Sequence, residues 1–173
     1  MTMMIGFWGD DFDTPDERAF SNFYPAPFDD GEHHFTCSEQ YFMWMKAMTF
    51  HDDSIASRLL QLPVGVNPIR YKRLGRKIVG YDDAVWKRVR RDIMLDACER
   101  KYSANKHLAD ILLGTEHATL VECSPFDRIW GIGLGKHDAD GNIDNRWRDQ
   151  SHWRGENLLG QVLAEVREKL KKE

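Results

Sequence analysis

Residues 38–48 read SEQYFMWMKAM, and this apolar stretch predicts a helix that begins near Ser38. Thr36 and Glu39 are three residues apart, which is the spacing of a capping box just before an apolar run. Apolar side chains occupy most sides of this helix, so we expect it to be buried.

Shorter elements flank this helix along the chain. We expect strands over residues 3–8, 33–36, 118–123 and 128–132, and helices over 54–61, 67–77, 82–101, 103–114 and 155–171. Asn67, Asp82 and Ser103 are the expected caps of three of these helices. The elements predict an α+β fold, predominantly helical with a small sheet, in a single domain spanning residues 1–173.

Composition and residue patterns argue against several classes of protein. Lys and Arg number 24 against 28 Asp and Glu, so the net charge of −4 disfavours a module that binds bare duplex DNA by charge. The three cysteines form no CxxC pair, and the seven histidines form no HExxH pattern, so we expect neither a metal nor a cofactor. No apolar run approaches the ~20 residues of a membrane span, and the first residues lack the basic region of a signal peptide. We therefore expect a cytoplasmic protein with no membrane partner.

Glu39 and Lys46 are the first candidate for chemistry. They are seven residues apart, so both side chains lie on one face of the helix, about 10.5 Å apart along its axis. A lysine on an apolar helix loses hydration, which lowers its pKa and favours the neutral amine needed for a Schiff base. Glu39 could then transfer protons, although its charge by itself raises the lysine pKa. The structural alternative is that Glu39 only completes the capping box and Lys46 only extends to solvent.

Two further groups are candidates for substrate binding. Residues 70–77 carry five basic side chains, and Arg76, which follows Gly75, is the candidate for a phosphate contact. Glu122, Asp127 and Trp130 lie at and just after a predicted strand, where carboxylates beside a tryptophan can bind a sugar or a base. The alternatives are a solvated helix face for the basic run, and a turn aspartate with a core tryptophan for the second group.

Four motifs in order resemble the NADAR, or YbiA-like, family. They are FSNFY at 20–24, SEQYF at 38–42 continuing to Lys46, LVE at 120–122 with Asp127, Trp130 and Gly131, and GENLLG at 155–160 with Arg167. The resemblance implies a metal-free N-glycosidase that cleaves the bond between a ribose and an amino nitrogen. It implies two possible substrates: a phosphoribosylamine from early riboflavin synthesis, or an ADP-ribosyl group on guanine, including guanine in nucleic acid.

The resemblance also implies roles for individual residues. Lys46, Glu39 and Asp127 are the catalytic candidates, with an imine on Lys46. Most of the substrate-binding candidates lie in these motifs: Asn22, Phe23, Tyr41, Glu122, Trp130, Gly131 and Asn157. Two more come from the residues themselves and not from the resemblance: Arg76 of the basic run, for phosphate, and Trp86, whose ring could stack on the base or close the pocket. Two alternatives remain open at this point. One is a direct glycosidase route in which a carboxylate activates water and Lys46 only positions phosphate, and the other is a module that binds ADP-ribose or a nucleotide without catalysis.

Overall fold

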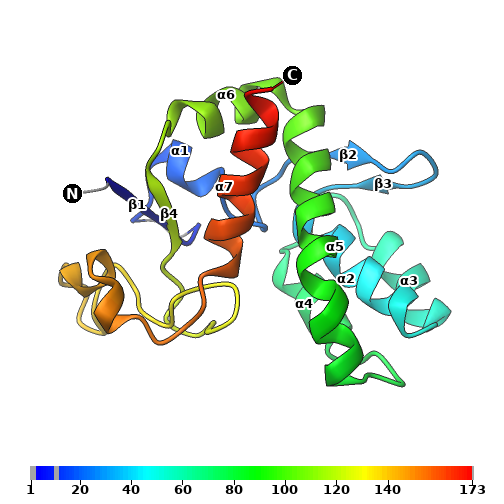
Figure 1. Ribbon diagram of the computed structural model, residues 1–173. Helices are drawn as coiled ribbons and strands as arrows, with labels where there is room; N and C mark the ends of the chain where they lie inside the picture. The colour runs from blue at the N-terminus through cyan, green and yellow to red at the C-terminus, as the bar shows by residue number, and fades with distance from the viewer. Residues whose placement is uncertain (1–2, 10–11, 173) are drawn as a thin grey trace. The chain divides into compact units, whose positions relative to one another are not determined.

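The computed structural model describes residues 3–9 and 12–172, which divide into two compact units (Figure 1). Unit 1 comprises residues 1–21 and 108–173, and unit 2 comprises residues 22–107. Each unit has its own small sheet and its own helices, and each is described separately below. The expected assignment of all 173 residues to one domain stays a prediction.

Unit 2 is built around a central helix. Its elements are the strands β2 (Phe28–Asp29) and β3 (His34–Phe35) and the helices α2 (Ser38–Thr49), α3 (Asp53–Leu60), α4 (Ile69–Gly75) and α5 (Asp83–Ala104). β2 and β3 form an antiparallel hairpin, and α2 contacts α3, α4, α5 and β3. Figure 1 shows α5, drawn in green, as the long helix of this unit. The buried helix predicted to begin near Ser38 is therefore confirmed.

The start of α2 differs from the capping box that the sequence predicts. Cys37 is the N-cap and makes no side-chain capping bond. The Thr36 hydroxyl instead lies 3.0 Å from both Gln40 Oε1 and the Tyr71 hydroxyl. The backbone N–H of Glu39 donates to the carbonyl oxygen of Asn22 at 3.0 Å. A distant segment thus satisfies a helix-end donor that the local pattern assigns to Thr36.

Unit 1 contains a parallel pair of strands covered by a helix. β1 (Met4–Phe7) pairs with β4 (Thr119–Glu122), with Gly6 opposite Val121. The other elements are α1 (Pro15–Arg18), most of α6 (Lys106–Gly114), the 3₁₀ helices η1 (Asn145–Arg148) and η2 (Gln150–His152), and α7 (Leu158–Leu170). α7 packs on β4, and a Cβ on Gly160 would lie 2.1 Å from the Leu120 carbonyl oxygen. Glycine is thus required for this close approach of helix and strand.

Most predicted elements are confirmed, and the α+β class with them, but one predicted strand and three predicted helix starts are wrong. Asn67 is not the N-cap of α4, because Pro68 occupies that position and α4 begins at Ile69, whose N–H donates to Asn67 Oδ1 at 3.0 Å. Ser103 does not cap a new helix, because α5 continues through Ala104. Residues 128–132 form turns rather than a strand. The last helix begins at Leu158, not near Gly155, because Asn157 has a left-handed backbone (φ 53°). Among the described residues, no helix has the length and hydropathy needed to cross a membrane.

Candidate active site

Glu39 and Lys46 lie on one face of α2, as their spacing predicts. At about 100° per residue, positions 39 and 46 are within about 20° of each other around the helix, with Phe42 and Met43 flanking them. Glu39 is buried, with 6% of its surface exposed, and Lys46 is half-buried. The structure thus places a carboxylate and an amine on the same apolar face.

The Lys46 amine lies against an aromatic wall, which consists of Phe42, Tyr81 and Trp86. Lys46 Nζ is 4.4 Å from the ring centroid of Tyr81 and 5.6 Å from that of Trp86. The ring centroids of Phe42 and Trp86 lie 5.1 Å apart. Nζ also donates to the Gly75 carbonyl oxygen at 3.3 Å, at the end of α4. The amine is therefore held by a carbonyl and by ring faces.

This environment lowers the pKa of Lys46. Burial is the main cause, since it penalises the charged form, and the charge of Arg76 adds to it. The charge of Glu39 acts in the opposite direction but does not restore the ordinary value. A lysine with a lowered pKa has a larger fraction of neutral, nucleophilic amine at neutral pH.

Asn22 and Ser38, whose backbones adjoin Glu39, each carry a buried side-chain oxygen without a partner in the described part of the chain. Asn22 Nδ2 donates to Met94 Sδ at 3.3 Å. Its buried Oδ1 and the buried hydroxyl oxygen of Ser38 have no hydrogen-bond partner among the residues that the structure describes. Buried polar atoms are rarely left unpaired, so such atoms indicate a place for a ligand or water. Asn22 Oδ1 is an acceptor suited to a sugar hydroxyl.

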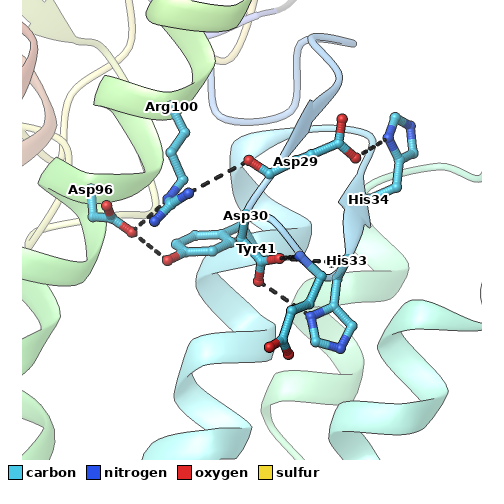
Figure 2. Close-up of polar contacts among 8 residues, drawn as sticks. Asp29, Asp30, His33, His34, Tyr41, Asp96 and Arg100 are labelled. Atoms are coloured by element: carbon cyan, nitrogen blue, oxygen red, sulfur yellow. Dashed lines mark hydrogen bonds and ion pairs between the residues drawn. The ribbon is translucent and has the colours of Figure 1, made fainter.

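The opposite face of α2 has a structural role. Tyr41 is 3% exposed, and its hydroxyl donates a short hydrogen bond to Asp96 on α5. Arg100 Nε donates to the same carboxylate at 3.0 Å (Figure 2). Burial and this carboxylate raise the pKa of Tyr41, so its hydroxyl stays protonated. Tyr41, a predicted substrate contact, is thus engaged in joining two helices.

The other predicted residues of unit 2 occupy different settings. Arg76 is exposed after α4, near enough to Lys46 to influence its pKa, and Phe23 is half-buried next to Asn22. Trp86 is 6% exposed, so most of its surface packs within the unit. Tyr81, 44% exposed and in closest ring contact with the amine, offers the accessible aromatic face.

Asp127 and Trp130 lie together in a turn of unit 1. Asp127 Oδ1 accepts hydrogen bonds from the backbone N–H groups of Ile129 at 2.9 Å and Trp130 at 2.8 Å. Both side chains are half-buried. This geometry matches the structural interpretation of Asp127 as a turn residue, and its catalytic role stays a prediction.

Asn157 and Gly131 join the start of α7 to the end of β4. The Asn157 amide accepts from the Glu122 N–H at 3.0 Å and donates to the Leu120 carbonyl oxygen at 2.9 Å. A Cβ on Gly131 would lie 2.9 Å from the Glu122 carbonyl oxygen, so the chain requires glycine for this approach. Glu122, Gly131 and Asn157 thus form one backbone junction, and their roles in substrate binding stay predictions.

Several partners of the charged groups were not predicted from the sequence. The contacts of Lys46 with Gly75 and Tyr81 join distant positions, and the only local signal is an aromatic residue directly before the Asp82 cap of α5. In unit 1, Lys136 pairs with Asp13 and lies 3.2 Å from Glu17 Oε2. No group of three or more possible metal ligands is found among the residues described.

Comparison with known proteins identifies relatives along nearly the whole chain. Protein irg-1 of Caenorhabditis elegans is 42% identical over 168 residues, which cover 88% of this chain and 75% of that protein. An N-glycosidase of Acanthamoeba polyphaga mimivirus is 33% identical over 156 residues, covering 87% of this chain and 86% of the viral protein.

A solved structure supports the same grouping. The NMR structure of the Escherichia coli protein YbiA matches with a TM-score of 0.74 and 27% identity, covering 99% of this chain and 87% of that one. YbiA of strain K12 is named an N-glycosidase. The family model of the NADAR domain matches residues 6–171, and the chain therefore belongs to the NADAR domain family.

Proposed function

We propose that the chain is an N-glycosidase, a hydrolase that cleaves the C–N bond between a ribose and an amino nitrogen. The observation that carries the proposal is the half-buried Lys46 amine, whose pKa is lowered on the same helix face as the buried Glu39. Relatives named N-glycosidases from a virus and a bacterium support the reaction class.

The reaction proceeds through an imine on Lys46. A ribosylamine opens to an imine between C1 and the leaving nitrogen, and the neutral Lys46 amine attacks C1. The C–N bond to the base breaks, and the base leaves as a neutral amine after Glu39 protonates its nitrogen. Water then adds to the lysine imine with Glu39 as base, which releases the sugar aldehyde and regenerates the amine.

Side chains next to this pair bind the sugar. Asn22 Oδ1, buried and unpaired within the described part of the chain, accepts a hydrogen bond from a ribose hydroxyl. The exposed ring of Tyr81 contacts the apolar part of the substrate beside the amine. Arg76 contributes positive charge for a substrate phosphate.

The substrate is a phosphoribosylamine or an ADP-ribosyl group on a guanine-type base, as a small molecule or in nucleic acid. Trp130 and Asp127 are further candidates for base and hydroxyl contacts, and a cytoplasmic location remains part of the proposal. The direct route without an imine is less well supported. Burial lowers the pKa of Lys46, which favours a neutral amine over a fixed phosphate-binding charge.

A hydrolysis assay tests the reaction class. The protein is incubated with a phosphoribosylamino-pyrimidine and, separately, with ADP-ribosylated guanine DNA, and released sugar is quantified by chromatography. We expect release from at least one substrate, and a loss of at least about 100-fold in Glu39→Gln because proton transfer is removed.

The matched control is Glu32→Gln, which changes an exposed glutamate of the same unit. It should retain wild-type turnover. Tight binding of ADP-ribose without release of sugar from either substrate would contradict the enzyme and favour a binding module.

A further inference from the structure

A cavity in unit 2 is lined by positively charged side chains. It has a volume of about 480 Å³ and lies between α3 and α4. Its lining comprises Arg58, Gln61, Leu62, Arg70, Arg73, Leu74 and Lys77. Four of these seven residues are cations and none is an acid, although the whole chain has a net charge of −4.

The helical repeat explains why these cations converge. Residues 70, 73 and 74 follow the spacing i, i+3 and i+4 on one face of α4, and Lys77 lies in the turn just after α4 ends at Gly75. α3 and the segment just after it add Arg58 and Gln61 from the other side. Arg76 falls outside this spacing and does not line the cavity. The cavity is thus on a different face of α4 from the side chain that acts on Lys46.

The four cations have no partner carboxylates. Within the described ranges, Arg58, Arg70, Arg73 and Lys77 make no ion pair. Elsewhere cations are matched, as in the contacts of Lys87 with Asp83 at 2.7 Å and of Arg146 with Asp144 at 2.6 Å. Between residues 53 and 77 there are six basic residues and one acidic residue, a formal charge of +5.

Asp52 does not neutralise this cluster. Its two oxygens accept from the backbone N–H groups of Val79 at 2.9 Å and Ile55 at 3.0 Å. These bonds lower the pKa of Asp52, and the charge of Arg58 contributes less. The four lining cations therefore repel one another, and a bound anion would offset this repulsion.

We propose that this cavity binds a ligand with adjacent phosphate groups, of the size of a nucleoside diphosphate. Arginine forks match phosphate oxygens in pairs, and three arginines with a lysine can bind more than one phosphate. The volume lies within the range of about 300–1,000 Å³ for small-molecule sites and exceeds the need of a single phosphate. Leu62 and Leu74 provide an apolar surface for the rest of the ligand. This inference concerns binding alone and does not depend on the glycosidase reaction.

Calorimetry with the full chain tests the proposal. The probes are inorganic pyrophosphate, ADP, adenosine and an oligothymidylate, each titrated at two salt concentrations. The variant is Arg70→Gln with Arg73→Gln, both exposed, and thermal melts check that it folds. The charge-matched control is Arg88→Gln with Lys172→Gln, which are exposed and do not line the cavity.

We expect pyrophosphate and ADP to bind, adenosine not to bind, and the Kd to rise at least tenfold in the cavity variant but less than twofold in the control. Higher salt should weaken binding because it screens the charges. The proposal is overturned if neither diphosphate binds, or if both double variants weaken binding equally. Binding of the oligothymidylate alone would also overturn it and would assign the cluster to a nucleic-acid backbone.

Discussion

Two lysines of similar burial have pKa values shifted in opposite directions. Lys46 in unit 2 lies against the aromatic wall, and Lys136 in unit 1 lies in an acidic cage. We define the cage as Asp13, Glu17 and the Gly6 carbonyl, which lies 3.1 Å from Lys136 Nζ. Burial lowers the pKa of Lys46, with Glu39 opposing it. Burial also acts to lower the pKa of Lys136, but direct contact with Asp13 and the charge of Glu17 raise it above the ordinary value of 10.5.

The contrast shows that burial alone does not make a lysine nucleophilic. A carboxylate in direct contact fixes the ammonium form and makes the lysine a structural ion, as in the cage. A carboxylate that acts only through its charge, as Glu39 does on Lys46, leaves the effect of burial dominant. The wall residue Lys46 should therefore affect turnover, and the caged Lys136 should affect the free energy of unfolding. Separate variants of the two lysines test these two roles.

The largest effect is expected from Lys46→Arg. Arginine keeps the positive charge but cannot form an imine, so turnover of a ribosylamine should fall by at least about 100-fold. The matched change, Lys136→Arg, should leave turnover within a few-fold, because the cage needs only a cation. Steady-state assays of both variants measure the difference. Wild-type turnover in Lys46→Arg would favour the direct route, in which this residue supplies only charge.

Removing the two charges should affect stability in the reverse order. Lys136→Met leaves the buried Asp13 without its cation and should lower the free energy of unfolding by about 3 kcal/mol. Lys46→Met removes a desolvated charge and keeps the apolar stem, so stability should stay within about 1 kcal/mol of wild type or rise. Urea unfolding at pH 7 compares the two variants. Equal losses in both would remove the distinction between wall and cage.

A fully buried lysine extends the comparison to pH. Burial lowers the pKa of Lys101 to about 8, against 10.5 in an unfolded chain, while charges on Cys98 and Cys37 oppose the shift. Above pH 8 the unfolded chain therefore binds more protons than the folded one, so the free energy of unfolding should rise with pH. This rise should be measured between pH 8 and pH 9. Above that range the cysteine thiols of the unfolded chain, whose ordinary pKa is 9.0, ionise as well.

Urea unfolding across this window measures the slope. Its upper limit is about 1.4 kcal/mol per pH unit for one proton. Lys101→Met should reduce the slope, since methionine does not titrate, and the lowered pKa of Lys46 should account for the rise that remains. A slope that persists unchanged in Lys101→Met would assign the pH dependence to another group.

The smallest effect is expected from Tyr41→Phe on the opposite face of α2. It removes the hydroxyl that donates to Asp96, so the free energy of unfolding should fall by about 1 kcal/mol. Turnover should be nearly unchanged, because this hydroxyl faces α5 rather than Lys46. Thermal melts and the sugar-release assay read the two properties in parallel. A large loss of turnover with normal stability would restore Tyr41 as a substrate contact.

Local patterns predicted what depends on local geometry. The apolar run gave α2, and a two-turn spacing placed Glu39 and Lys46 on one face. Asp82 caps α5 as its position predicts, because an aspartate can bind the next free N–H groups without help from elsewhere. The predominantly helical class was likewise predicted from local periodicity, and the family resemblance was found from short contiguous motifs.

Contacts between distant segments could not be predicted. Thr36 fails as a cap because Gln40 and the distant Tyr71 take its hydroxyl, while Asn22 takes the Glu39 N–H. Likewise Gly75 and Tyr81 meet Lys46 only after α4 and α5 pack on α2. The burial that this packing produces lowers the pKa of the amine, so spacing alone left the nucleophilic and solvated interpretations of Lys46 open.

Reductive trapping can locate a covalent intermediate on Lys46. The protein is mixed with a ribosylamine substrate and sodium borohydride, and intact mass with peptide mapping locates any adduct. We expect a sugar adduct on Lys46 that is absent from Lys46→Arg and still formed by Lys136→Arg. Turnover of the substrate with no adduct, or an adduct that persists in Lys46→Arg, would contradict this expectation.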